Sequence, residues 1–231
     1  MTSPAPLAPE HLRFAVLAAD TVLFTLKDGA LYVRLSKVNR APEFVESKGL
    51  PGGLLEAHET AAQAATRQLK ERGKIESGTF YCEQLYTFSD IERDPRGRVV
   101  AVAYLALIPW DALSAKDKVN TPEAWWEKVS QAKPLAYDHN DILQTALERL
   151  RSRVTYTTII GKLLPKEFTL SELETAYEAI TKKRLDKRNF RKKIEKLGVL
   201  TEVKGKKRTG PFRPATLYRF KRLQVTEMPI L

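Results

Sequence analysis

With 231 residues the chain exceeds a minimal domain, and its length fits one large domain or two small ones. Its 43% of hydrophobic residues can bury real cores, its 29% of charged residues is ordinary for a soluble protein, and its net charge is +11. No apolar run approaches the roughly 20 residues of a membrane span. Cys82, the only cysteine, excludes an intrachain disulfide and fits a reducing compartment.

The positive charge lies in one part of the chain. Residues 1–150 contain 18 Lys and Arg against 20 Asp and Glu, whereas residues 151–231 contain 21 against 8. A nearly neutral part joined to a strongly basic one is typical of a sensor or enzyme linked to a module that binds a polyanion. A solvated, lysine-rich surface is the alternative that charge alone leaves open.

The first residues, MTSPAPLAPE, lack the basic region and the apolar core of a secretory signal, so we expect a cytoplasmic protein. Because this stretch is rich in Ala and Pro, residues 1–10 are predicted to form a disordered tail. The remaining chain is predicted to form two domains, one over residues 11–153 and one over residues 154–231.

Two strands open the first domain. Residues Phe14–Thr25 and Ala30–Leu35 are rich in apolar and β-branched side chains, and the pair Asp28 and Gly29 lies between them. An Asp-Gly pair at this place is a hairpin signal. A looser segment over residues 42–48 then leads to a pair of glycines.

The rest of the first domain alternates between helical and extended patterns. A helix is predicted over Glu59–Arg72, because apolar residues recur there at helical spacing. Strands Phe80–Phe88 and Val99–Ile108 flank the polar turn at residues 90–97, and a second helix covers Asp138–Arg153. Strands, helix, strands and helix make an α+β domain.

The segment after the two glycines carries a motif. It resembles the Nudix box, and the residues that fit its pattern are Gly53, Glu59, Arg67, Leu69, Glu71 and Ile75. The residues that depart from it are Gln68, Arg72 and Lys74, the last of which stands where the pattern has glycine. In Nudix hydrolases three glutamates of this helix hold a divalent metal over a diphosphate. Two of those three positions are changed here.

Helix geometry decides what these changes do. At about 100° per residue, Gln68, Glu71 and Arg72 share one face of the helix. One carboxylate beside one guanidinium is nearly neutral, and hard cations such as Mg²⁺ need carboxylate oxygens. Glu59 is expected roughly 18 Å away along the helix and cannot fill the gap. We therefore predict no catalytic residue, no metal and no required cofactor, and expect Arg72 to attract phosphate directly.

Two further segments narrow the family. RDPRGRVVAVAY, from Arg93 to Tyr104, and PLAYDHNDIL, from Pro134 to Leu143, resemble Nudix-related transcriptional regulators of the NrtR type. These regulators join a Nudix-like sensor to a winged helix, so the resemblance implies a small-molecule ligand at the sensor. The residues expected to bind this ligand are Gly52, Gly53, Glu71, Arg72, Arg93, Asp94 and Arg96.

Each of these features also has a purely structural alternative. The charged turn that ends at Gly97 can leave its arginines solvated. His139 is expected to be a hydrogen-bonded structural residue, and Trp125 and Trp126 are expected in a core or an interface. The helix of the motif can be an ordinary amphipathic helix without a ligand.

The basic part begins with a helix-turn-helix pattern. Thr169 and Glu172 have the spacing of a capping box, which starts one helix. A short basic turn follows, and a second helix starts at Asp186 as its N-cap and ends at Gly198. The outer face of this second helix is basic. Such a pair is typical of a helix-turn-helix, whose second helix enters the major groove of DNA.

Two strands follow, Val199–Val203 and Thr216–Phe220, joined by the cationic loop KGKKRTGPFRPA. This hairpin is predicted to be a wing, and the whole segment is similar to the winged helix of the same regulators. A small winged domain that binds protein is the alternative. The residues expected to contact DNA are, at phosphates, Lys187, Lys192, Lys206 and Lys207; at base edges, Arg188, Asn189 and Arg191; and, in the wing, Arg208 and Arg213.

These patterns together predict an α+β protein with an N-terminal Nudix-like α/β/α sandwich around a mixed sheet and a C-terminal winged helix-turn-helix domain. The resemblance implies a repressor of NAD metabolism genes that binds a palindromic double-stranded DNA operator as a homodimer. ADP-ribose or a related nucleotide is the implied effector that releases it. Two alternatives stay open: a sugar-responsive regulator of the same architecture, and an active nucleoside diphosphate hydrolase with a nucleic-acid-binding module.

Overall fold

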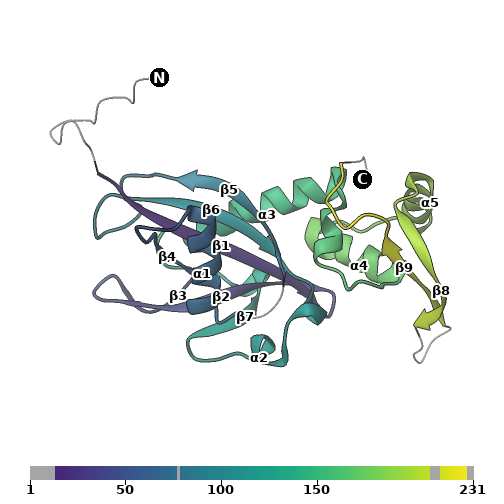
Figure 1. Cartoon of the computed structure of the whole chain (residues 1–231), viewed down its shortest axis with the longest axis horizontal. Coiled ribbons are helices and arrows are strands. Elements are labelled where there is room, and N and C mark those ends of the chain that lie inside the picture. Colours follow the sequence, from purple (N-terminus) through teal and green to yellow (C-terminus); the bar gives the residue numbers. More distant parts are fainter. Residues whose placement is uncertain (1–13, 77–78, 209–213, 228–231) are drawn as a thin grey trace, which may run out of the picture.

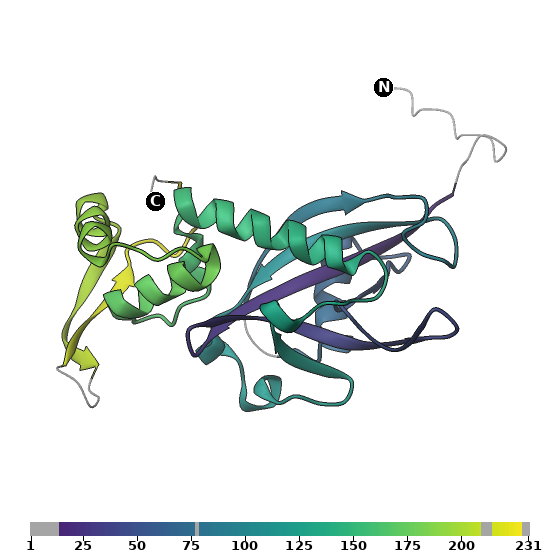
Figure 2. The same cartoon turned by 180° about the vertical axis from the view of Figure 1, so that it is seen from behind.

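Figure 1 shows the computed structural model, which describes residues 14–76, 79–208 and 214–227. A larger lobe built on a sheet is followed by a smaller lobe with two helices and a hairpin. Helix α3 runs from the sheet to the smaller lobe, as Figure 2 shows from behind. The tail predicted for residues 1–10 lies outside the described residues.

One mixed sheet organises the larger lobe. Its strands follow the order β3-β2-β1-β6-β5, with β4 paired to β1 and β7 paired to β2. β1 runs parallel to β6, and the other pairs are antiparallel. The strands are β1 (Val16–Lys27), β2 (Ala30–Arg40), β3 (Phe44–Gly49), β4 (Gly52–Leu54), β5 (Tyr81–Phe88), β6 (Val99–Leu107) and β7 (Ala124–Lys128).

The hairpin between β1 and β2 turns at the predicted Asp-Gly pair. Asp28 has a φ of 49° and Gly29 a φ of 71°, the left-handed geometry of a two-residue type I′ turn. The tip of the hairpin packs against the smaller lobe, since a Cβ added to Gly29 would lie 3.1 Å from Cγ2 of Thr175. The predicted hairpin is confirmed.

Helices cover both faces of the sheet. Ala19 of β1 shares a core cluster with Ala64 and Ala65 of α1, whereas Val22 of β1 shares one with Ile142 of α3. Because side chains alternate along a strand, these clusters lie on opposite faces, which confirms the α/β/α sandwich. Within the described ranges, no helix has the length and apolarity of a membrane span. The helices of this lobe are α1 (Ala61–Glu71), α2 (Ala115–Lys118) and α3 (His139–Tyr156), with 3₁₀ turns η2 (Trp110–Ala112) and η3 (Val129–Gln131).

Three short strands were not expected from the sequence: β3, β4 and β7. The segment at residues 42–48, predicted to be loose, contributes most of β3, in which only Gly49 is buried. An edge strand with so little buried surface lacks the apolar alternation that marks a strand. β7 carries Trp125 and Trp126, which fit a half-buried pleated surface.

The smaller lobe contains the predicted helix-turn-helix. The Thr169 hydroxyl accepts a hydrogen bond from the Glu172 amide at 3.1 Å, and the Glu172 carboxylate accepts one from the Thr169 amide at 2.7 Å, so the capping box is confirmed. Asp186 caps the second helix, and Gly198 ends it with a φ of 61°. The elements are η4 (Thr158–Lys162), α4 (Leu170–Thr181), α5 (Lys187–Leu197), β8 (Leu200–Arg208) and β9 (Ala215–Phe220).

The hairpin of the smaller lobe differs from the prediction in one respect. β8 continues through Arg208, so half of the predicted loop is strand. Its pairing with β9 shifts register between Glu202 and Lys207, and Gly205 lies in this interval with a φ of 75°. A bulge therefore accommodates Gly205, and the strand resumes beyond it.

The two lobes share one hydrophobic core. Phe24 of the sheet, Leu150 of α3 and Tyr177 of α4 belong to the same cluster of buried residues. Nε of Arg151 donates to the Ile180 carbonyl at 3.1 Å and ties α3 to α4. The predicted boundary between residues 153 and 154 falls inside α3, so this division into two domains stays a prediction.

Candidate functional sites

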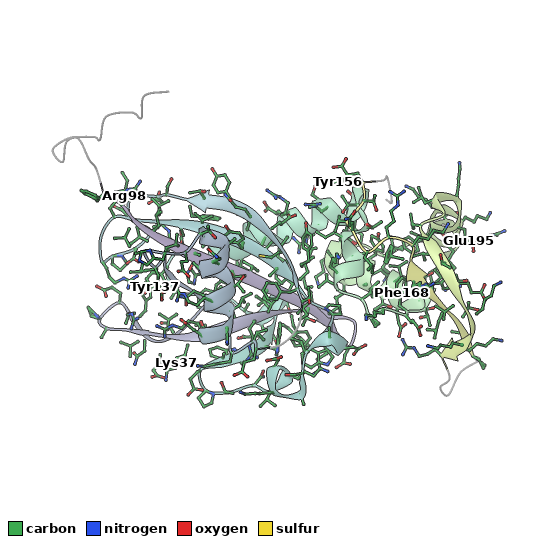
Figure 3. All side chains as sticks on the ribbon, viewed as in Figure 1. Lys37, Arg98, Tyr137, Tyr156, Phe168 and Glu195 are labelled. Atoms are coloured by element: carbon green, nitrogen blue, oxygen red, sulfur yellow. The ribbon has the colours of Figure 1, made fainter. Side chains whose placement is uncertain are left out.

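A cavity of about 540 Å³ lies in the sheet lobe. Figure 3 labels two of its lining residues, Lys37 and Tyr137, at the end of this lobe that is remote from Glu195 on α5. The structure brings together here every residue that the sequence predicts to bind a ligand: Gly52, Gly53, Glu71, Arg72, Arg93, Asp94 and Arg96. Contact of these residues with a ligand stays a prediction.

The paired glycines let three elements meet at the cavity. A Cβ on Gly52 would lie 1.9 Å from Oδ1 of Asp20 and 3.0 Å from the Ala19 carbonyl oxygen on β1, so glycine is needed there. A Cβ on Gly53 would lie 2.5 Å from the end of the Gln68 side chain on α1, which would have to move. The two glycines thus allow β4 to pack closely between β1 and α1.

The face of α1 that borders the cavity shows the predicted trio Gln68, Glu71 and Arg72. Gln68 is buried, and in the amide orientation that satisfies its neighbours it donates to the Gly52 carbonyl at 3.1 Å and accepts from Arg67 Nη1 at 2.9 Å. The Glu71 carboxylate accepts from the same Nη1 at 3.0 Å. In the described part of the chain, no group of three or more His, Cys, Asp or Glu side chains is placed to hold a metal ion.

Arg67 is the centre of a cluster of acids beside this face. Its Nε and Nη2 donate to Glu59 at 3.0 and 2.5 Å, and Nη2 also donates to the Leu54 carbonyl at 3.0 Å. The hydrogen bonds from Arg67 lower the pKa of Glu59 to about 2. Glu59 and Arg67 thus form an ion pair that holds the segment before α1 against the helix.

The predicted position of Glu59 was wrong. Glu59 precedes the helix, which starts at Ala61 after its N-cap Thr60, so the helical rise does not apply to it. Because Glu59 and Glu71 both bind Arg67, the two carboxylates lie close together rather than at opposite ends of the helix. Both are nevertheless committed to the Arg67 guanidinium.

Arg93 is buried in the wall of the cavity and is not solvated. Its Nε and Nη2 donate to the two Asp138 oxygens at 2.8 and 2.7 Å, and Nη2 lies 3.3 Å from Oδ2 of Asp20. A guanidinium shared by two carboxylates has few donors left for a ligand. Arg93 therefore fastens the turn before β6 to β1 and to the start of α3.

Asp94 and Arg96 form a second internal pair. Arg96 Nε and Nη2 donate to Asp94 at 2.9 and 2.6 Å, and the Arg96 guanidinium lies 5.6 Å from the ring centre of Tyr137. These hydrogen bonds lower the pKa of Asp94 and keep its carboxylate charged. The Arg93 and Arg96 side chains of the charged turn are thus held by acids, unlike in the structural alternative, which left its arginines solvated.

His139 and the two tryptophans have the structural roles that the sequence indicated. Nδ1 of His139 accepts from the Leu50 amide at 2.9 Å, and burial lowers the pKa of His139, so its imidazole is neutral. Trp126 is buried, with Nε1 donating to the Asp117 carbonyl at 2.9 Å. Trp125 is half-buried on the same strand.

Several cavity residues were not singled out from the sequence. Lys37 and Arg40 come from β2, and Tyr137 precedes α3, so only the tertiary fold brings them to the cavity. Lys74 had a local signal, because it replaces the glycine of the motif. Its φ of 52° shows that the position keeps the left-handed geometry that favours glycine.

The exposed face of α5 carries three of the four α5 cations that the sequence assigned to DNA, Lys187, Arg188 and Lys192, together with Asn189. Asn189 also donates to its N-cap, with Nδ2 3.1 Å from Asp186. Arg191 is different. Its Nε donates to the buried carboxylate of Glu174 on α4 at 2.6 Å, which fastens α5 to α4.

The wing cations lie on β8, on the same module. Lys206 Nζ is 3.2 Å from Glu167, and Arg208 Nη2 is 3.1 Å from Glu172, so both approach the start of α4. Lys207 is exposed, with no ion-pair partner among residues 14–76, 79–208 and 214–227. Arg213 lies outside the described residues.

Comparisons with known proteins agree with this two-part structure. Residues 160–220 match the family described as the NrtR DNA-binding winged helix domain, and residues 16–147 match the NUDIX domain. The chain is 35% identical over 209 residues to the ADPR responsive transcriptional repressor NtrR of Acinetobacter baylyi. This similarity covers 89% of the chain and 82% of that protein.

Two solved structures from Shewanella oneidensis are similar to this chain, one over most of its length and one over the larger lobe. The crystal structure of NrtR complexed with a 27mer DNA has a TM-score of 0.77 and 34% identity, over 89% of this chain and 93% of that one. The cocrystal structure of the NUDIX domain of NrtR complexed with ADP ribose has a TM-score of 0.52 and 32% identity, over 62% of this chain and 94% of that one.

Proposed function

The chain belongs to the NrtR family, and we propose that it represses transcription until ADP-ribose or a related nucleotide binds its Nudix domain. The observation that carries this proposal is the cavity of about 540 Å³, lined by all the residues predicted to bind a ligand, in a chain that also carries a basic winged helix. The target genes are those of NAD metabolism, as the family resemblance implies. The site of action is the cytoplasm.

The Nudix domain acts in this proposal as a sensor without hydrolytic activity. Gln68 and Arg72 occupy two of the three positions that hold metal in Nudix hydrolases. The remaining carboxylate, Glu71, accepts from Arg67. An amide, a guanidinium and one engaged carboxylate do not fit Mg²⁺, which prefers several carboxylate oxygens. The donor set thus favours binding of the nucleotide over its hydrolysis.

The winged helix binds double-stranded DNA in this proposal through the exposed face of α5. Arg188 and Asn189 face base edges in the major groove, because guanidinium matches guanine and a carboxamide matches adenine. Lys187, Lys192 and Lys207 contact phosphates, which gives affinity and register without sequence information. We no longer assign Arg191 to a base, since it is bound to Glu174.

The complete regulator is a homodimer on a palindromic operator. One winged helix reads a half-site, and two related by a twofold axis read both halves. Release requires that the effector bind the free and the DNA-bound states with different affinity. In each protomer the shared core and the Arg151 contact with α4 connect the cavity domain to the winged helix.

The test is a gel-shift titration with promoter DNA from the gene itself and its neighbours. ADP-ribose, NAD, ATP, arabinose and xylose are each added with Mg²⁺, and each nucleotide is assayed for breakdown. Release by intact ADP-ribose is the expected result. Release by a pentose alone would assign the chain to sugar-responsive regulation, and rapid breakdown without specific DNA binding would make it a hydrolase.

A further inference from the structure

We propose that Arg72 and Lys74 bind the diphosphate of the effector directly, in the place that a divalent cation takes in Nudix hydrolases. The inference rests on the proposed function, because it assigns residues to the nucleotide that the cavity is proposed to bind. It makes recognition of the diphosphate independent of metal. Four observations on the cavity carry it.

The acids of the cavity are largely neutralised by arginines outside the proposed pair. Asp20 is 3.3 Å from Arg93, and Asp94 is 2.6 Å from Arg96. Glu71 is 3.0 Å from Arg67. These pairs remove most of the negative field that would repel a phosphate. Of the acids that line the cavity, only Glu123 has no ion-pair partner among the described residues.

The cations of the cavity divide into engaged and available ones. Arg93 and Arg96 are engaged, and Lys37 lies 2.7 Å from Glu46. Arg40, Arg72 and Lys74 are exposed, line the cavity and form no ion pair with any residue in the described part of the chain. Arg40 lies on β2, whereas Arg72 and Lys74 stand two residues apart at the end of α1, so a diphosphate can contact both.

Lys74 occupies a backbone conformation that disfavours it. Its φ of 52° lies in the left-handed region, where a side chain is strained and glycine is not. The Nudix pattern has glycine at this position, and glycine would adopt this φ without strain. The chain nevertheless carries a lysine there. Strain that persists on the wall of a cavity indicates a role for the side chain in that cavity.

The end of α1 holds this segment firmly. The Gly73 carbonyl accepts from Nε of the fully buried Arg34 at 2.7 Å, and the Ile75 amide donates to the Leu69 carbonyl at 3.1 Å. A Cβ on Gly73 would lie 2.5 Å from that Leu69 oxygen. Lys74 is therefore set between two anchored residues, which reduces the entropy lost when it binds an anion.

The helix dipole explains why cations are needed there. The C-terminal end of a helix carries a partial negative charge and by itself repels phosphate. A metal ion would overcome this repulsion, but Gln68, Glu71 and Arg72 do not form a site for one. A guanidinium and an ammonium supply fixed positive charge, and the guanidinium can bind two phosphate oxygens at once.

The experiment is calorimetric titration of the full chain with ADP-ribose, in buffer with Mg²⁺ and in buffer with EDTA. The variants are Arg72→Gln and Lys74→Gly. The matched controls are Lys70→Gln, which removes an exposed charge of α1 that does not line the cavity, and Lys182→Gly, which removes a lysine with a φ of 59° from the winged lobe. Thermal melting is recorded for every protein.

We expect the wild type to bind ADP-ribose equally with Mg²⁺ and with EDTA. Arg72→Gln and Lys74→Gly each weaken binding about tenfold or more, the value of one charge-assisted hydrogen bond. Lys74→Gly keeps its Tm or raises it by up to about 4 °C, because it relieves backbone strain. A loss of affinity without loss of stability separates a binding role from a structural one. The two controls keep wild-type affinity.

Two failures have different meanings. If the wild type binds ADP-ribose but needs Mg²⁺, or if both cavity variants keep wild-type affinity, this inference is overturned and the proposed function stands. If the wild type does not bind ADP-ribose under either condition, the proposed effector itself is wrong. AMP, which has no diphosphate, serves as a second titrant. If Arg72 and Lys74 bind the diphosphate, the variants lower the affinity for AMP less than the affinity for ADP-ribose.

Discussion

The arginines around the cavity and the cations on the outer face of α5 are used in opposite ways. In the sheet lobe, Arg67, Arg93 and Arg96 are bound to acids and hold loops and helices in place. On α5, Lys187 and Arg188 are exposed and form no ion pair with another described residue. A paired cation positions its neighbours, whereas an unpaired one is available to a polyanion. Whether an arginine can bind a polyanion therefore depends on the acids around it in the fold, and the number of arginines in a segment does not show this.

Removal of a paired cation should destabilise the protein more than any other change considered below. Arg93→Met removes the partner of Asp20 and Asp138 and leaves two carboxylates without it, one of them buried. Loss of one partner of a buried pair costs about 3–5 kcal/mol, so the free energy of unfolding in urea falls by that amount. Arg72→Gln, at an unpaired cation of the same cavity, changes it by less than about 0.5 kcal/mol. If the two variants lowered the free energy of unfolding equally, the distinction between paired and unpaired cations would be wrong.

Helix α5 carries both kinds of cation, the unpaired Arg188 and the paired Arg191. Arg188→Ala weakens operator binding about 10-fold to 100-fold, because a base contact contributes about 1–3 kcal/mol, and it leaves Tm unchanged. Arg191→Ala lowers Tm, since it leaves the buried Glu174 carboxylate without its guanidinium. Gel shift and thermal melting check both variants, with effector affinity as the common control. If Arg191→Ala lowered operator affinity at unchanged Tm, Arg191 would read DNA after all.

A third prediction concerns pH and the wall of the cavity. The pKa of His139 is lowered by burial, so its neutral form is stabilised in the folded state and the amide of Leu50 has an acceptor. This contribution is complete above pH 6.5 and is lost as the pH falls below it, by at most about 1.4 kcal/mol per pH unit. His139→Asn, which keeps an acceptor without a titration, gives a flatter stability curve between pH 6.5 and 5. Glu59, with a pKa of about 2, does not titrate in this window.

The turns and helix caps that form between residues close in the sequence could be predicted from the sequence. The turn at Asp28 and Gly29, the capping box at Thr169 and the N-cap at Asp186 depend on residues within three positions of one another, and all were predicted correctly. The partners of Arg93 and Arg191 come from distant elements, so no spacing rule shows that these cations are engaged. The same limit applies to β3 and β7, which form only because β2 supplies two edges.

The core of the winged lobe contains a buried tyrosine whose replacement should change stability only slightly. Tyr177 is fully buried beside Phe190, with ring centres 5.1 Å apart, and among the described residues its hydroxyl has no hydrogen-bond partner. A buried hydroxyl without a partner costs about 1–3 kcal/mol, so Tyr177→Phe should raise the free energy of unfolding by about 1 kcal/mol and Tm by about 2–4 °C. Tyr156→Phe, at an exposed tyrosine, should leave Tm unchanged. If Tyr177→Phe instead lowered Tm, the hydroxyl would have a partner such as an ordered water.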